Sequence, residues 1–428
     1  MSFIADIHIH SHYSRATSRQ MNLENIFKWA QIKGITVVAT GDFTHPDWFN
    51  EIREKLEPAE EGLFVLKKEM AEIIQREVPT SCRGEVRFML STEVSSIYSK
   101  NNRVRKIHNI IYASSFDTVS KINGELQKIG NLRSDGRPIL GLDARELLKI
   151  VIGSSDDSML IPAHAWTPHF SIFGDRSGFD SLEECFEELT PDIHAIETGL
   201  SSDPPMNWRL SPLDKITLIS NSDAHSPEKL GREANIFNTE LSYNAIRDAI
   251  IDGNRDKFPY TIEFFPEEGK YHFDGHRACQ TRMSPGETMK NKGICPQCKK
   301  KVTVGVMHRV VLLSDREEGI IPHTAPSFKS LIPLSEIISE AIGVGVNSKA
   351  VKREYMRLIN AIGSELKILQ DADIEKIKGI SSSKIGEGVE RVRTRNISIA
   401  PGYDGEYGKI RVFDSDKEEL SDHQMSMF

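Results

Sequence analysis

The chain has little of several features that would mark other classes of protein. Its 428 residues include only five cysteines, which is too few for a disulfide-stabilised secreted fold. Cys82 and Cys185 stand alone, as expected of small buried side chains in a reducing compartment. No apolar run is long enough to cross a membrane, and we expect no cleaved leader before the first predicted strand. These absences predict a cytoplasmic protein without a membrane partner.

The net charge of −8 is unevenly distributed along the chain. Residues 276–411 hold 23 Lys and Arg against 15 Asp and Glu, whereas residues 1–275 carry a net −12 and residues 412–428 a net −4. An acidic first part suits divalent cations, and a basic second part suits phosphates. The total charge therefore does not exclude a nucleic-acid partner. If DNA is that partner, we expect the protein to be associated with the nucleoid.

Short apolar runs alternate with helical patterns over residues 1–262. Strands are predicted at 3–9, 35–40, 86–91, 107–113, 159–163, 194–197 and 216–221, with 234–238 as an addition. Helices are predicted at 23–33, 63–76, 116–129, 144–151, 181–188 and 242–251. This order predicts an α/β fold with a parallel sheet closed as a barrel, whose functional residues lie at the carboxyl ends of the strands.

Histidines and carboxylates stand at nearly every one of these strand ends. His8 and His10 share one face of the first strand, because alternate residues of a strand point the same way. The later strands contribute Asp42, His45, Glu93, His164, Glu197, Asp223 and His225, and His108 stands near the beginning of its own strand. Imidazoles and carboxylates converging in one pocket predict two or three divalent cations, with Zn²⁺, Mn²⁺ or Fe²⁺ favoured over Ca²⁺.

Taken in order, these motifs resemble the PHP (polymerase and histidinol phosphatase) family of metal-dependent phosphoesterases. The resemblance implies a distorted (β/α)7 barrel over residues 1–262 with a trinuclear metal centre, filled by Zn, Mn, Mg or Fe. It implies that His8, His10, Glu93 and Asp223 hold one ion. Glu93 would bridge to a second ion on His108 and His164, and His225 would hold a third with Asp42 or His45.

Two positions depart from the family pattern. Arg15 follows Ser14 where the family often has an acid, and His45 follows Asp42 by three residues instead of one. We predict that Arg15 places positive charge beside the cluster for the phosphate of a longer substrate. Catalytic parts are predicted for Arg15, Glu93, Asp223 and Glu197, with orientation of a metal-bound histidine as the alternative for Glu197.

A second metal motif lies in the predicted domain 263–325. His276-x2-Cys279 and Cys295-x2-Cys298 have the spacing of two short knuckles that hold a structural zinc. His272 and His308 are substitutes for His276 as the fourth ligand. The upstream Cys279 and the basic run Lys299-Lys300-Lys301 favour zinc over a redox role for the Cys-x2-Cys pair, and Lys299 and Lys300 also suit a phosphate.

A basic helical domain is predicted over residues 326–412, before an acidic tail at 413–428. Amphipathic patterns indicate helices at 333–344 and 348–371. Residues 377–395 resemble half of a helix-hairpin-helix, which would offer Lys384, Arg391 and Arg393 to DNA phosphates. A capped helix with a solvated basic face is the alternative for this segment.

The barrel, knuckle and helical domain in this order resemble the endonuclease Q family over nearly the whole chain. Matching stretches include 14–17, 41–46, 275–279 and 401–408. The resemblance implies an enzyme that nicks DNA 5′ of deaminated bases (uracil, hypoxanthine, xanthine) or abasic sites and leaves a 3′-hydroxyl and a 5′-phosphate. Residues predicted to line the base pocket or contact DNA are Ser14, Trp166, His169, Phe170, Asn207, Trp208 and Arg209, with core packing as the alternative for Trp166 and Phe170.

Other functions remain open from the residues alone. A PHP phosphatase acting on a small phosphomonoester would use the same cluster, and a non-catalytic DNA-binding repair accessory protein would use only the basic domain. The terminal Gln424-x-x-Met427-Phe428 is similar to the peptide that binds a sliding clamp, although the incomplete motif favours an unstructured terminus.

Overall fold

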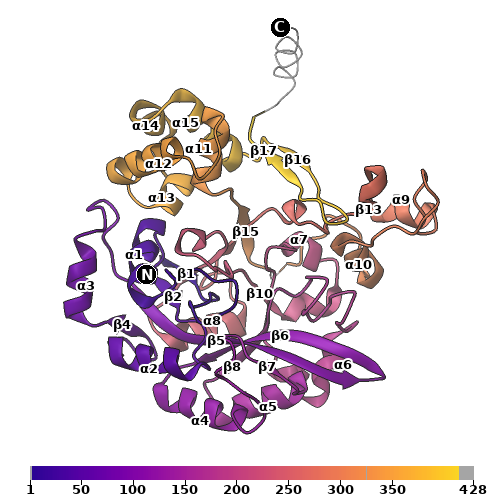
Figure 1. The fold of residues 1–428 in the computed structure, drawn as a ribbon, viewed down its shortest axis with the longest axis horizontal. Helices are drawn as coiled ribbons and strands as arrows, with labels where there is room; N and C mark the ends of the chain where they lie inside the picture. Colours follow the sequence, from indigo (N-terminus) through magenta and orange to yellow (C-terminus); the bar gives the residue numbers. More distant parts are fainter. Residues whose placement is uncertain (1, 324, 414–428) are drawn as a thin grey trace.

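The computed structural model describes residues 2–323 and 325–413, and Figure 1 shows their arrangement. At the centre of the largest sheet, β1 (Ser2–Asp6) runs parallel to β2 (Val37–Ala39), which runs parallel to β5 (Arg87–Lys100). On its other edge β1 pairs antiparallel with β11 (Ala234–Asn238), which is followed by β12 (Tyr260–Glu263) and β15 (Ser327–Ser330). The α/β expectation is therefore confirmed.

The expectation of a parallel sheet is confirmed only in part, because several pairings are antiparallel. β5 and β6 (Arg103–Ala113) form a long antiparallel hairpin around the turn at Asn101 and Asn102, both of which have positive φ. β6 also pairs antiparallel with β8 (Met159–Pro162), and the short β7 (Ile139–Leu140) lies parallel to β5. Because β6 runs opposite to its neighbours, the early part of this strand lies level with the late part of β5, and Ser95 pairs with His108.

The strands enclose one apolar core, to which β11 also contributes Phe237. β9 (Ala195–Glu197) and β10 (Thr217–Ile219) pair in parallel, and a bridge from Ile9 to Ala224 joins the chain after β10 to the chain after β1. One buried cluster takes side chains from β1, β2, β5, β6, β8, β9 and β10: Ala5, Val37, Met89, Ile110, Ile161, Ala195 and Ile219. Side chains from strands this far apart in the chain can meet in one cluster only if the strands curve around it.

Helices cover the outside of the sheet. They are α1 (Leu23–Lys33), α2 (Pro46–Lys55), α3 (Lys68–Gln75), α4 (Phe116–Leu126), α5 (Ala144–Ser154), α6 (Leu182–Phe186), α7 (Pro204–Asn207) and α8 (Tyr243–Asp252). The 63–76 helix expectation needs correction, because β4 (Phe64–Leu66) pairs with β3 (Leu56–Pro58) before α3 begins. α1 has the expected bounds: Asn22 accepts from the Asn25 amide at its start, and Gly34 ends it at a φ of 89°.

The second half of the chain adds two smaller parts. β13 (Asp274–His276), β14 (Thr281–Met283) and α9 (Pro285–Lys290) project on one side, beside α10 (Val306–Leu313) (Figure 1). α11 (Leu334–Ile342), α12 (Lys349–Ile362), α13 (Glu365–Gln370), α14 (Ile374–Ile380) and α15 (Ser383–Arg393) gather near α1, and β16 (Ser398–Ala400) pairs with β17 (Lys409–Arg411). The single expected helix at 348–371 is two helices separated at Gly363, whose φ is 136°.

A buried ion pair joins this helical group to the sheet layer. The Lys33 Nζ at the end of α1 lies 2.5 Å from the Glu365 Oε2 on α13, and Glu365 also accepts from the Tyr355 hydroxyl and the Leu334 amide. Among the described residues, no helix is both long and apolar enough to cross a bilayer. The predicted clamp motif at 424–428 lies outside the described residues.

Candidate metal centre

A first group of potential ligands lies where the chain leaves β1 and β10. One ligand atom each from His8, His10 and Asp223 lie within 4.8 Å of one another. The His10 Nε2 is 3.1 Å from the Asp223 Oδ1, and Asp223 adopts a positive φ of 46° that turns it into the cluster. Figure 1 places β1 beside β2 and β5, and β5 carries Glu93.

A second group adjoins the first through Glu93 on β5. Its Oε1 lies 2.7 Å from the His108 Nδ1 and 3.0 Å from the His164 Nε2. Its Oε2 lies 3.2 Å from the His10 Nε2 and 3.8 Å from the His8 Nε2. The two carboxylate oxygens of Glu93 therefore face the two groups separately, which is the geometry of a bridging ligand.

Two further carboxylates hold the ligand histidines from behind. Glu197 lies 2.9 Å from the His8 Nδ1, and it also accepts from the His164 backbone amide at 2.8 Å and from the Asn221 side chain. Asp42 lies 3.0 Å from the His10 Nδ1 and accepts from the amide of Ser11 and the hydroxyl of Ser14. These contacts turn the Nε2 atoms of His8 and His10 toward the cluster, as carboxylates do behind metal-bound histidines.

The charges in the cluster are closely balanced. Burial opposes ionisation of Glu93, but the His108 imidazole and the Arg137 guanidinium hold the pKa of Glu93 well below its usual range. Burial likewise opposes a charged His8, and the Glu197 carboxylate outweighs it and raises the pKa of His8. Burial lowers the pKa of His108 to about 4, and the neutral imidazole that this shift favours is the form that offers an electron pair to a cation.

Three ligand atoms fit a cation because they lack another partner. The Nε2 atoms of His8 and His10 and the Oδ1 of Asp223 are buried and make no hydrogen bond, although they lie close together. Leaving buried polar atoms unpaired costs free energy, and imidazole nitrogens with carboxylate oxygens are ligands that Zn²⁺, Mn²⁺ and Fe²⁺ prefer. The residues present therefore fit divalent cations.

The residues predicted to hold a third ion do not all converge on one point. The His225 ring lies 4.5 Å from the His10 ring, and its Nδ1 is 3.6 Å from the Asp223 Oδ1. The buried His45 stacks on Tyr13, and its Nδ1 makes no hydrogen bond. Asp42 already accepts from several donors, and it is placed to orient His10 instead of binding an ion itself.

The Arg15 side chain is mostly exposed near this end of the sheet. Its Nε lies 3.1 Å from Asp135, whose other oxygen accepts from the backbone amides of Arg15 and Arg137. Sequence reasoning missed Arg137, whose Nη1 lies 2.8 Å from the Glu93 Oε2. The only signal was a basic residue in a long connection, and that is too common to single one out.

The cysteine motif comes together as its spacing predicts. Ligand atoms of His276, Cys279, Cys295 and Cys298 all lie within 4.8 Å of one another, with 3.5 Å between the His276 Nδ1 and the Cys298 Sγ. His308 instead lies 2.7 Å from Asp274. His276 is thus the histidine of this group, and four protein ligands around one point leave no open position for chemistry.

The predicted base-pocket residues divide into buried and exposed sets. Trp166 is only 1% exposed, packs on Phe173 and donates to the fully buried Asn207, so core packing describes it and the base pocket does not. Phe170 lies beside the ligand His108 with 4.8 Å between ring centroids, and His169 is exposed next to it. Phe170 therefore lies beside the candidate metal cluster, and the exposed His169 precedes it in the chain.

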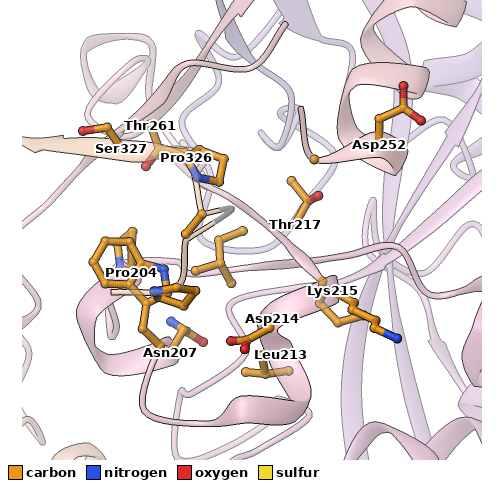
Figure 2. A pocket seen from close by; sticks show the side chains of 16 residues that line it. Pro204, Asn207, Leu213, Asp214, Lys215, Thr217, Asp252, Thr261, Pro326 and Ser327 are labelled. Carbon is orange, nitrogen blue, oxygen red and sulfur yellow. The ribbon is translucent and has the colours of Figure 1, made fainter. Parts of the chain in front are cut away.

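Asn207 and Trp208 line a different cavity, of about 310 Å³, which Figure 2 shows. Its walls include Lys215 shortly before β10, Thr217 at the start of β10 and Asp252 at the end of α8. Asp223 follows the other end of β10, so this cavity lies away from the metal ligands. Arg209 points toward Ser314 on the neighbouring segment. A base pocket formed by Asn207, Trp208 and Arg209 beside the metals does not fit these positions.

The basic residues predicted to contact DNA also differ in their surroundings. Arg393 donates to the carbonyls of Ile368, Leu369 and Ala372 and so serves the end of α13, which corrects its assignment to DNA. Arg391 lies 2.9 Å from Glu387, and the Lys384 ammonium lies over the Phe413 ring. Lys299 and Lys300 are exposed beside the cysteine group.

Comparisons with known proteins agree with this architecture. A model of the MJ0043 C-terminal domain family matches residues 333–396. The uncharacterized protein MJ0043 of Methanocaldococcus jannaschii is 36% identical over 257 residues, which cover 58% of this chain and 31% of that protein. The uncharacterized protein YqxK of Bacillus subtilis is 31% identical over 255 residues, which cover 59% of this chain and 61% of that protein. The chain thus matches less than two thirds of the length of either relative.

Two solved structures match nearly the whole chain. The lesion-specific endonuclease PfuEndoQ from Pyrococcus furiosus has a TM-score of 0.83 at 31% identity, with 99% of each chain covered. Endonuclease Q in complex with a 27-mer duplex carrying an abasic lesion at the active site has a TM-score of 0.81 at 30% identity, covering 98% of this chain and 100% of that one. The chain is therefore a member of a family of DNA endonucleases. That family is endonuclease Q.

Proposed function

We propose that this protein is a metal-dependent DNA repair endonuclease that hydrolyses the phosphodiester 5′ of a deaminated base or an abasic site. The observation that carries the proposal is the bridged cluster, in which Glu93 places one oxygen toward His108 and His164 and the other toward His8 and His10. A similar chain binds a duplex with an abasic lesion at its active site, which supports damaged DNA as the substrate. The products would be a 3′-hydroxyl and a 5′-phosphate.

His8, His10, Glu93 and Asp223 would hold one cation, and Glu93, His108 and His164 a second, with His225 and His45 available to a third. When bound, divalent cations polarise the phosphoryl group and stabilise the attacking and leaving oxygens of an in-line displacement. Glu197 and Asp42 keep the imidazoles of His8 and His10 in the orientation that presents Nε2. The protein's contribution is thus to preorganise the ligands and to keep their proton-bearing nitrogens away from the reacting phosphate.

Separate parts of the chain would hold the DNA. Phe170, His169 and Arg15 lie near the cluster and would contact the lesion strand close to the cut. Lys299, Lys300 and Lys384 would contact phosphates farther away, with a structural zinc at His276, Cys279, Cys295 and Cys298 keeping the knuckle folded. In this proposal a distorted seven-stranded barrel over residues 1–262 carries the metal cluster, residues 263–325 form the zinc knuckle, and residues 326–412 form the helical domain.

The test is cleavage of end-labelled duplexes that are identical except for one deoxyuridine, deoxyinosine or abasic site. We expect a nick on the 5′ side of the lesion with Mg²⁺ or Mn²⁺, and none in the undamaged duplex. A small phosphomonoester serves as the control substrate. Hydrolysis of the monoester with intact DNA would favour a phosphatase, and lesion binding without hydrolysis would favour an accessory protein.

A further inference from the structure

Arg137 is a cationic side chain in the metal centre that no ligand set uses. Its Nη1 lies 2.8 Å from the Glu93 Oε2, and Glu93 is fully buried while the arginine side chain is 29% exposed. The guanidinium has five N–H donors, and its contact with Glu93 uses only one end of the fork. Among the described residues the other N–H groups have no hydrogen-bond acceptor, and the partly exposed side chain leaves them available to a ligand.

The backbone around Arg137 is tightly held against the site. A Cβ at Gly136 would come within 2.4 Å of the Asp42 Oδ2 and 2.5 Å of the Ser14 Oγ, so only glycine allows this approach. The Gly136 amide donates to the Tyr13 carbonyl, and its carbonyl accepts from the Thr44 hydroxyl. Immediately after Arg137, the Pro138 carbonyl accepts from the Ser95 amide on β5. Such anchoring presents one side chain to the cluster at a constant position.

The charge balance around Arg137 changes when cations bind. An arginine guanidinium stays charged at any ordinary pH, and this one lies 2.8 Å from the Glu93 carboxylate. Glu93 carries one negative charge, and a cation held by Glu93 would take up that charge and would repel the guanidinium. A partly buried guanidinium beside cations then needs another anion. A phosphate fits, because it bridges cations and accepts two parallel bonds from an arginine fork.

We propose that Arg137 binds the scissile phosphoryl group and stabilises the charge on its non-bridging oxygens during cleavage. The inference rests on the proposed function, since it takes a phosphodiester as the occupant of the cluster. The contact with Glu93 holds the guanidinium beside the cluster, where a substrate phosphate would meet it. Arg137 is thus a catalytic residue that exchanges the Glu93 carboxylate for the substrate phosphate.

The first measurement is binding of inorganic phosphate to the full-length protein loaded with Mn²⁺, by titration calorimetry. Loss of a charge-assisted pair predicts about 10- to 100-fold weaker binding for Arg137→Ala. Arg137→Lys keeps the charge without the fork and should fall between the two. Arg145→Ala, which removes an equally shielded ion-paired arginine from α5, should bind phosphate like the wild type. Manganese content is measured for every variant, so that loss of metal is not mistaken for loss of phosphate.

The second measurement is single-turnover cleavage of the abasic duplex at saturating Mn²⁺. We expect Arg137→Ala to lower the rate about 100-fold or more, in the range for losing one electrostatic donor, and added guanidinium to restore part of it. Equal phosphate affinity in wild type and Arg137→Ala, or no phosphate binding by the metal-loaded wild type, would overturn the inference. Phosphate binding that depends on Arg137 in a wild type that leaves the abasic duplex intact would instead overturn the proposed function alone.

Discussion

Replacing Glu197 with glutamine should weaken both folding and metal binding, because this carboxylate serves three donors at once. It accepts from the His8 ring, the His164 amide and the Asn221 side chain, and all three are buried. A glutamine offers one carbonyl oxygen, and its NH₂ group must replace the second acceptor. At least one donor then loses its acceptor and the new NH₂ group has none.

Each buried donor without a partner costs about 1–3 kcal/mol, so we expect the free energy of unfolding to fall by about 2–6 kcal/mol. The loss of a carboxylate behind a metal-bound histidine predicts about 10- to 100-fold weaker metal affinity. Denaturant unfolding of the metal-free protein gives the first quantity, and Mn²⁺ titration against a competing chelator gives the second. Glu72→Gln on the exposed face of α3 is the matched control and should change neither.

The reasoning would be refuted by a Glu197→Gln variant that binds Mn²⁺ within twofold of the wild type. A variant that loses stability but keeps its metal affinity would show that Glu197 holds the strands together without orienting His8. Glu197→Asp keeps the negative charge on a shorter side chain. Wild-type Mn²⁺ affinity in this variant would show that the charge of residue 197 matters and its side-chain length does not.

Three further predictions concern other parts of the molecule. Cys295→Ser should remove one zinc per chain, measured by elemental analysis, and should lower the melting temperature, while the barrel cluster binds Mn²⁺ as in the wild type. Unchanged zinc content in this variant would contradict the role of Cys295 as a zinc ligand. Lys33→Met should reduce the free energy of unfolding by about 3–5 kcal/mol in denaturant titration, because Glu365 stays buried without its cation. A loss below about 1 kcal/mol would show that the Tyr355 hydroxyl and the Leu334 amide are enough to stabilise the buried Glu365 carboxylate. Burial raises the pKa of Glu263 from 4.5 to about 8, so between these pH values the folded state holds a proton that the unfolded state has released. The free energy of unfolding should therefore fall by about 1.4 kcal/mol for each pH unit of increase in this range. Glu263→Gln should flatten this pH dependence in melting curves, and an unchanged slope would argue against a protonated Glu263.

Much of the metal cluster could be predicted because strand ends and motif spacing are local properties. His8 and His10 follow from a two-residue period, and the knuckle ligands follow from Cys-x2-Cys spacing. His108 was harder, since it stands near the start of its strand. The antiparallel direction of β6 places His108 opposite Ser95 and within 2.7 Å of Glu93, and strand direction is set by pairing between distant segments.

What sequence reasoning could not supply depends on contacts between segments far apart. Asp42 has the residue type of a ligand, and only its bonds to Ser11, Ser14 and His10 show that its oxygens are already engaged. Trp166 and Arg393 have residue types that suit DNA, but burial and bonds to carbonyls commit them to the fold. Arg137 reaches Glu93 through a connection whose path no local pattern encodes.

The central claim is that the bridged cluster of histidines and carboxylates cuts damaged DNA with bound cations. The most direct measurement compares wild type with Asp223→Asn in single-turnover cleavage of an abasic duplex, with Mn²⁺ present or removed by chelator. We expect a nick 5′ of the lesion by the metal-loaded wild type, loss of cleavage by chelation, and DNA binding without cleavage by Asp223→Asn. Cleavage by Asp223→Asn at the wild-type rate, or by the chelated wild type, would contradict the account.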